Sequence, residues 1–124
     1  MDIKDSIMNN FKQLKVWQKA VELTAEIYKI TKLFPVSEQY GIISQITRSA
    51  VSVPSNIAEG SARTTAKDFN HFLSIALGSS FETETLLVIS RNLGYQNNKD
   101  FERLSSNVCE TQKMIRGLQK SNIS

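Results

Sequence analysis

The sequence contains a single cysteine, Cys109, among its 124 residues. One cysteine excludes an internal disulfide and a cysteine-rich zinc site. No uninterrupted apolar run approaches the roughly 18 residues that indicate a membrane-spanning helix. The first ten residues, MDIKDSIMNN, include acidic side chains and lack the apolar stretch of a secretory signal. These absences favour a cytoplasmic protein without membrane contact, and the length fits one domain.

Motifs of common enzymes are also missing. The one histidine, His71, follows Asp68 by three positions, whereas di-metal sites in helical bundles use paired Glu-x-x-His motifs. No Gly-x-x-x-x-Gly-Lys phosphate loop occurs. Cys109 belongs to a different predicted helix from the histidine, so it has no neighbouring base to activate it. We therefore expect no catalytic residue, no metal, no cofactor and no enzymatic activity.

Strand signals are nearly absent, because no Asn-Gly or Asp-Gly hairpin occurs and apolar residues recur at intervals of three and four. The first predicted helix covers about residues 14–32. The residues FPVSE end it, since a residue before proline is pushed out of helical conformation. Its apolar seam consists of Val16, Ala20, Leu23, Ile27, Ile30 and Phe34.

A second helix is predicted to begin near Ser37, a favourable N-cap residue, and to end near Gly60. Pro54 lies inside it and lacks the amide that would bond to the carbonyl of Ala50. The apolar pattern keeps its phase across Pro54, so we expect a kink there rather than a break. The seam consists of Ile43, Ile46, Ala50, Val53 and Ile57.

Capping residues mark two further helices. Thr65 and Asp68 open the third, Gly94 closes it, and Asn97 with Asp100 opens the fourth. Four helices joined by short loops predict an all-α, up-down-up-down antiparallel four-helix bundle. We expect one domain over residues 1–124, with flexible ends at 1–12 and 119–124. The seam of the fourth helix is Phe101, Leu104, Val108, Thr111, Ile115 and Leu118.

The third helix is apolar around nearly its whole circumference. A helix of this kind is usually buried on more than one side. In so small a bundle we expect the second contact to be another subunit, although single exposed apolar residues are common on any surface. One face has Phe69, Phe72, Leu73 and Ala76, and other faces have Ile75, Leu77, Phe81, Val88 and Ile89.

Polar residues form a lane along the second helix at steps of four and three. The lane consists of Gln45, Ser49, Ser52, Asn56, Glu59 and Arg63. It could be a recognition strip or a polar layer that joins helices or subunits, and we favour the structural role. Function is expected only at its Arg63 end.

Basic residues gather at the end of the bundle where the first helix begins and the fourth ends. This basic end consists of Lys12, Lys15, Lys19, Arg63, Lys67, Lys113, Arg116 and Lys120, with Lys4 before them. The net charge of the chain is +3. Cations near the ends of the second and fourth helices could merely complement helix dipoles, but those that begin the first helix lie where the dipole disfavours them. We therefore expect this end to bind the phosphates of RNA or DNA.

Several segments, in order, resemble a known family. They are LKVWQKAVEL, IYKITKLFP, EQYGIISQITRSAVSVPSNIAEGSAR, FLSIALGSSFETET and RNLGY. The chain thus resembles the bacterial 23S rRNA intervening-sequence proteins, whose name establishes no biochemical activity. The resemblance implies a left-handed antiparallel bundle that assembles as a ring-like homopentamer. A more distant likeness is to the accessory variability proteins of diversity-generating retroelements, basic rings that bind nucleic acid and a reverse transcriptase.

Two functions remain open from the sequence. The leading hypothesis is a non-enzymatic oligomer that binds nucleic acid, with RNA as the first guess. The alternative is a protein-interaction scaffold whose ring recruits a partner protein. Most aromatic residues fall on apolar faces, so no base-stacking motif is visible and recognition of a particular sequence is not expected.

Overall fold

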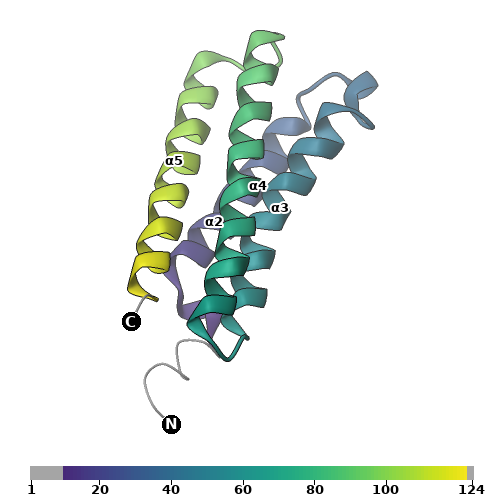
Figure 1. The fold of residues 1–124 in the computed structure, drawn as a ribbon. Helices are drawn as coiled ribbons and strands as arrows, with labels where there is room; N and C mark the ends of the chain where they lie inside the picture. Colours follow the sequence, from purple (N-terminus) through teal and green to yellow (C-terminus); the bar gives the residue numbers. More distant parts are fainter. Residues whose placement is uncertain (1–9, 123–124) are drawn as a thin grey trace.

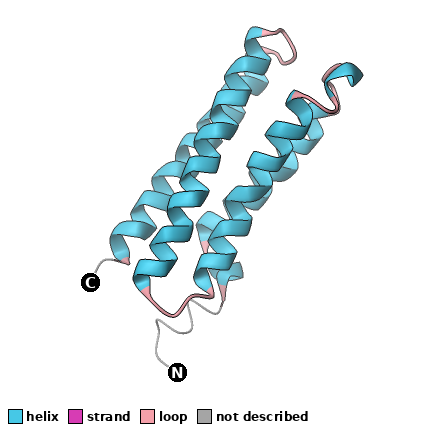
Figure 2. Ribbon diagram, turned by 45° about the vertical axis from the view of Figure 1, so that its right-hand side comes forward, coloured by secondary structure: helices cyan, strands magenta, loops and turns pink. Residues whose placement is uncertain are grey.

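The computed structural model describes residues 10–122, and helices account for all regular structure in that range. Four long helices and two short 3-10 turns follow one another along the chain (Figures 1 and 2). Their bounds are η1 Phe11–Gln13, α2 Lys15–Thr31, η2 Val36–Glu38, α3 Ile42–Ser61, α4 Ala66–Asn92 and α5 Asn98–Ser121.

The four long helices form an antiparallel bundle, as the sequence predicts. Each helix packs against the helices before and after it, and α5 returns to pack against α2. The start of α2, the α3–α4 turn and the end of α5 therefore meet at one end of the bundle (Figure 1). The α2–α3 connection and the α4–α5 turn lie at the other end.

The core consists of two apolar clusters and follows most of the predicted seams. Ile43, Phe101 and Leu118 are only partly buried, and at the start of α3 the buried residue is Ile42 rather than the predicted Ile43. All six residues of the seam predicted for the first helix are buried, and the last of them, Phe34, lies beyond the end of α2.

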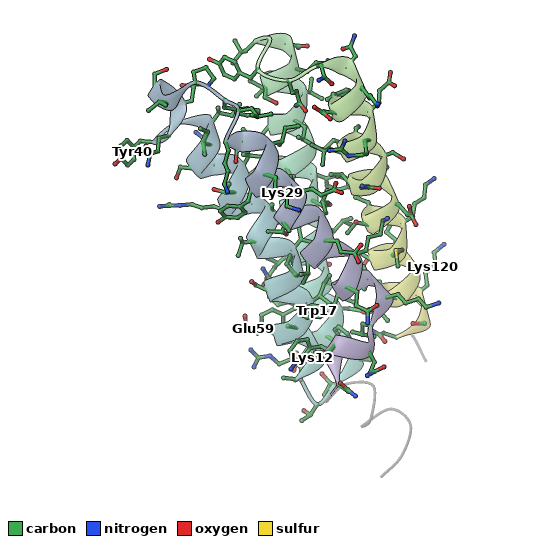
Figure 3. The ribbon with its side chains drawn as sticks, turned by 180° about the vertical axis from the view of Figure 1, so that it is seen from behind. Lys12, Trp17, Lys29, Tyr40, Glu59 and Lys120 are labelled. Atoms are coloured by element: carbon green, nitrogen blue, oxygen red, sulfur yellow. The ribbon has the colours of Figure 1, made fainter. Side chains whose placement is uncertain are left out.

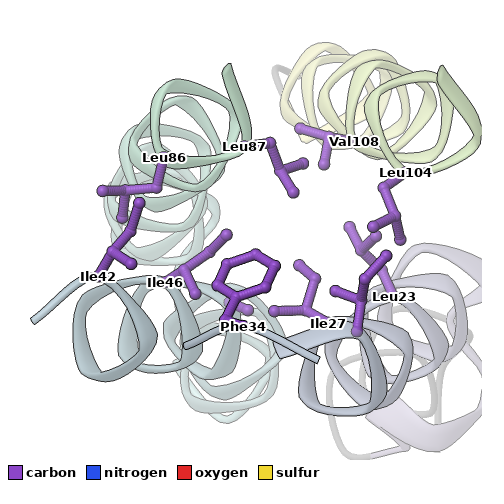
Figure 4. Close-up of a cluster of buried hydrophobic side chains, with 11 residues drawn as sticks. Leu23, Ile27, Phe34, Ile42, Ile46, Leu86, Leu87, Leu104 and Val108 are labelled. Carbon is purple, nitrogen blue, oxygen red and sulfur yellow. The ribbon is translucent and has the colours of Figure 1, made fainter. Parts of the chain in front are cut away.

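One cluster, near the α4–α5 turn, brings Ile27, Ile46, Leu87 and Leu104 together from all four long helices (Figure 4). The other surrounds Leu73 and extends towards the basic end. Each fully buried leucine or isoleucine contributes about 1.5–3 kcal/mol through burial alone.

The start of α3 differs from the prediction. Ser37 is exposed within η2 and caps no long helix, and α3 begins five residues later at Ile42. The amide of Gly41 donates to the carbonyl of Glu38 at 3.0 Å, which closes a separate turn before the helix. The prediction was wrong here because one short-range capping signal cannot distinguish a single 3-10 turn from the first turn of a long helix.

α3 runs unbroken through Pro54, as predicted, and Pro54 is buried. The Ala50 carbonyl, which Pro54 leaves without an amide partner, lies 3.1 Å from the hydroxyl of Thr24 on α2. The same hydroxyl is 2.7 Å from the carbonyl of Ala20, so its proton is shared between two acceptors. A neighbouring helix thus satisfies the group that proline leaves free. The kink itself stays a prediction.

The predicted caps of the last two helices are confirmed. The side chains of Thr65 and Asn97 accept hydrogen bonds from the amides of Asp68 and Asp100, at 3.1 and 2.8 Å. Gly94 has φ +79°, a conformation that glycine adopts at no steric cost, and it follows the end of α4. These caps fix where α4 and α5 begin and how sharply the chain turns between them.

α4 is the long, apolar helix of the bundle. Ile75, Phe81 and Ile89 are 40–45% exposed. Leu77, which the sequence places away from the Phe69 face, is instead buried in the same cluster as Phe69. By length and a mean hydropathy of 1.4 over 18 residues, α4 could cross a membrane. Within residues 10–122 it instead packs against both α3 and α5.

The chain ends that the sequence predicts to be flexible fall partly on residues 1–9 and 123–124, outside the described part. Residues 119–121 continue α5. Gln119 donates to the Ser74 hydroxyl at 3.0 Å, and Asn122 donates to the Asn70 side chain at 3.0 Å. These bonds join the last turn of α5 to α4.

Candidate nucleic-acid interface

The middle of the polar lane on α3 faces α4. The hydroxyl of Ser49 lies 2.8 Å from that of Thr83, and both side chains are buried. One turn further along, Ser79 donates to Ser52 at 2.8 Å. Asn56 donates to the same Ser52 hydroxyl at 2.9 Å. These bonds form a polar layer between two helices, so the middle of the lane is occupied by contacts within one subunit.

The last turn of α3 packs closely on α4. A Cβ atom placed on Gly60 would lie 2.7 Å from the Cβ of Phe72 and 3.0 Å from the ring of Phe69. The guanidinium of Arg63 covers the Phe72 ring at 4.5 Å from its centre and forms an ion pair with Glu59 at 3.2 Å. This end of the lane therefore holds Arg63 against the surface, while Gln45 at the other end is exposed.

The predicted basic end is assembled from three parts of the chain. Figure 3 shows Lys12 and Lys120 towards the end of the bundle where the described chain begins and α5 ends, with Glu59 nearby and Tyr40 at the opposite end. Lys15 and Lys19 are on the first turns of α2. The remaining members are Arg63, Lys67, Lys113 and Arg116. Lys4, the ninth predicted cation, lies outside the described residues.

Two of these eight cations are engaged in ion pairs. Lys19, whose side chain is 23% exposed, lies 3.1 Å from Glu110 and joins α2 to α5. Arg63 is paired with Glu59. Within residues 10–122 the other six have no ion pair, and all six are exposed: Lys12, Lys15, Lys67, Lys113, Arg116 and Lys120. Among the described residues, the unpaired positive charge at this end is therefore carried by these six cations.

A groove of about 230 Å³ runs between α4 and α5. Its lining residues are Phe81, Cys109, Gln112, Lys113 and Arg116. Gln112 donates to Glu84 at 2.8 Å and connects the two helices beside the groove. From the sequence, Phe81 is expected only at a subunit contact. Its proximity to two cations of α5 depends on how the two helices face each other, which helical spacing alone does not determine.

A larger groove of about 490 Å³ lies at the opposite end, between the end of α2, η2 and the start of α3. Its apolar part includes Phe34, Val36 and Ile43, and its tyrosines are Tyr28 and Tyr40. Tyr40 and Val36 are 92% and 83% exposed. The groove also has two cations, Lys32 and Arg48.

Near that groove, Tyr95 packs with its ring centre 5.5 Å from that of Phe34. Burial, followed by the charge of Glu38 and a hydrogen bond to it, raises the pKa of Tyr95 above its usual value. All three effects favour the neutral phenol.

The residues considered for catalysis lie apart from one another. His71 is exposed on α4 with its ring centre 5.5 Å from that of Phe72, and Cys109 is half-buried on α5. Within residues 10–122, no three side chains of histidine, cysteine, aspartate or glutamate come together as metal ligands would.

The antiparallel packing and the two apolar clusters between the helices define the class of this molecule as a four-helix bundle protein. A family model described as 23S rRNA-intervening sequence protein matches residues 12–117. The chain belongs to this family, which confirms the resemblance seen in its sequence. The further likeness to accessory variability proteins stays a prediction.

The chain is also similar to a crystal structure from Bacteroides thetaiotaomicron, described as a protein with unknown function from the S23 ribosomal protein family. The two are 29% identical with a TM-score of 0.75, and the match covers 85% of this chain and 98% of the other. No curated protein matches the chain. These comparisons support the fold and the family, and neither description states an activity.

Proposed function

We propose that the protein binds nucleic acid without catalysing a reaction, through phosphate contacts made by its basic end. The observation that carries this proposal is the set of six exposed cations without an ion pair among residues 10–122. The three acidic residues described at the same end are Glu59, Asp68 and Glu110. Two of these are paired with Arg63 and Lys19, so they do not neutralise the free cations.

RNA is the ligand we expect first, because the family description refers to a 23S rRNA intervening sequence. We propose the bacterial cytoplasm as its location, where such RNA is present. Phosphate contacts carry no base information, so affinity should depend little on sequence. A homo-oligomer, which we propose to be a pentamer, would repeat the basic end in each subunit and multiply weak contacts through avidity.

A salt titration with two matched variants tests the proposal. The first variant changes Lys15, Lys113, Arg116 and Lys120 to glutamine and leaves the paired Lys19 and Arg63 intact. The control changes four exposed cations outside the basic end, namely Lys29, Lys32, Arg48 and Lys99, and removes the same total charge. Binding is measured on one RNA and one DNA oligonucleotide between about 50 and 200 mM salt. Over this range a protein that makes 6–10 phosphate contacts loses about 10³–10⁵-fold in affinity.

The wild-type protein should bind more weakly as salt rises. In a plot of the logarithm of the binding constant against the logarithm of the salt concentration, each neutralised phosphate steepens the downward slope by about 0.7 for single strands and about 0.9 for B-DNA. The first variant should show lower affinity and a shallower slope on both oligonucleotides, and the control should resemble the wild type. Equal slopes for the two variants would reject the basic end as the binding surface.

The groove at the opposite end favours a second candidate function, that of a scaffold that recruits a partner protein. Its apolar surface would accept apolar side chains, and Lys32 and Arg48 would attract carboxylates. The partner would thus be an acidic segment with apolar anchors. A wild-type protein that binds neither oligonucleotide at 50 mM salt would leave this candidate ahead.

A further inference from the structure

We propose that the groove between α4 and α5 binds an unpaired base of single-stranded nucleic acid, which stacks on the ring of Phe81 while neighbouring phosphates contact Lys113 and Arg116. The inference rests on the proposed function and adds a preference for single strands over duplexes. It also revises the expectation that no base-stacking residue is present.

The ring of Phe81 is available for stacking. The side chain is 45% exposed and lines the groove. Two other phenylalanine rings are covered by arginine, since Arg63 lies over Phe72 at 4.5 Å and Arg91 lies over Phe101 at 4.0 Å. Within residues 10–122, Phe81 takes part in no aromatic pair and no cation–π contact. Phe81 therefore offers exposed side-chain surface in the groove on which a base can stack.

Two cations lie on the other side of the same groove. Lys113 and Arg116 are three residues apart on α5, a spacing that places them on one face of a helix. The acidic side chains near them are engaged elsewhere, because Glu110 pairs with Lys19 at 3.1 Å and Glu84 accepts a hydrogen bond from Gln112 at 2.8 Å. The groove thus combines an open aromatic ring with two available cations.

This combination distinguishes single strands from duplexes. Phosphates are accessible in both, so Lys113 and Arg116 attract both through charge. A base inside a duplex is already stacked on both faces, whereas an unpaired base can turn out and stack on an aromatic side chain. Phe81 therefore strengthens the binding of a single strand without strengthening that of a duplex.

A subunit contact is the competing role for Phe81, and its neighbours argue against that role. Ile75 and Ile89 are also exposed on α4, but neither lines the groove. Covering Phe81 with another subunit would also desolvate Lys113 and Arg116. Burying two cations without acidic partners is costly. A nucleic acid supplies both the aromatic surface and the negative charge that the groove lacks.

The test compares Phe81→Leu, which keeps an apolar side chain but removes the π face, with Phe81→Tyr, which keeps the face. Tyr40→Ala, at the opposite end, is the control for loss of an exposed aromatic. Each variant is titrated with a 12-nucleotide single-stranded RNA, the DNA of the same sequence and the corresponding RNA duplex at one salt concentration. Light scattering and circular dichroism check assembly and folding. Phe81→Leu should weaken single-strand binding by about 5- to 150-fold, the range expected for one stacked base, and leave duplex binding unchanged.

Cys109 provides a second readout, because it lines the groove and is the one cysteine of the chain. Saturating single-stranded RNA should slow its alkylation in the wild type. Unchanged single-strand affinity in Phe81→Leu, an equal loss on the duplex, or an altered oligomer mass would overturn the inference. If one of these results is found but the variant with glutamine at positions 15, 113, 116 and 120 binds more weakly than the wild type, the proposed function stands without the stacking inference. Absence of any binding by the wild type would reject both.

Discussion

Replacing Gly60 with alanine should destabilise the protein, although alanine is the better helix former. Gly60 is buried in the last turn of α3, where a Cβ would lie 2.7 Å from the Cβ of Phe72. Carbon atoms in good contact are about 3.5–4.0 Å apart, so α3 and α4 would have to separate locally by about 1 Å. The neighbouring atom is a Cβ fixed to the α4 backbone, so a change of rotamer cannot relieve the overlap.

The magnitude follows from two opposing effects. Overpacking of this kind costs about 1–3 kcal/mol, and removing a helical glycine returns about 0.5–1 kcal/mol. We expect a net loss of roughly 1–2 kcal/mol in the free energy of unfolding. At about 4 °C per kcal/mol for a chain of this size, the melting temperature should fall by roughly 4–8 °C.

Two other helical glycines provide controls, because a Cβ at Gly78 or Gly117 would meet no atom within 4 Å among the described residues. Alanine at either position should stabilise the protein by about 0.5–1 kcal/mol. The assay is urea and thermal unfolding of all three variants at one protein concentration, since stability depends on concentration if the protein assembles. A Gly60→Ala variant as stable as the two controls would refute the close packing of α3 on α4.

Two further predictions concern the interior and the assembly. Thr24→Val should lower the free energy of unfolding in urea by about 1–3 kcal/mol, because the buried Ala50 carbonyl loses its donor, and Thr24→Ser should lower it less. In a Pro54→Ala background the loss should be smaller, because the alanine amide can bond to the Ala50 carbonyl. An equal loss with and without Pro54 would contradict this coupling. Light scattering at micromolar concentration should give several times the 14.0 kDa chain mass, and five times if the assembly is a pentamer, whereas a monomer would contradict the proposed homo-oligomer.

Features of the fold that depend on neighbours in sequence could be predicted. The Thr65 and Asn97 caps are each formed by residues three positions apart, and both are present. The seam from Val16 to Ile30 depends only on helical spacing, and all its members are buried. Ser37 is the exception, because its local signal fits a short 3-10 turn as well as the start of a long helix, and the short turn η2 forms there.

Features that depend on how one helix faces another could not be predicted in the same way. The sequence shows that Pro54 leaves the Ala50 carbonyl free, but the donor comes from Thr24, 26 residues earlier and on another helix. The pairing of Lys19 with Glu110 and the groove shared by Phe81 and Arg116 likewise depend on the rotation of α5 relative to its neighbours. Helical periodicity fixes the positions of side chains around one axis and leaves the relative rotation of two axes to the packing of the whole core.

The acidic residues of the basic end also bear on its function. Asp68 is in the first turn of α4, where the helix dipole favours a negative charge. Glu110 joins α5 to α2 through Lys19, and Glu59 holds Arg63, so each acid has a structural role that leaves the outer cations free. Exposed ion pairs contribute only about 0–1 kcal/mol, so a phosphate can displace Glu59 from Arg63 at little cost. Lys19 is less exposed and joins two helices, so its release would weaken the bundle. If the basic end binds phosphates as we propose, Arg63 is thus the paired cation that would join the six free ones.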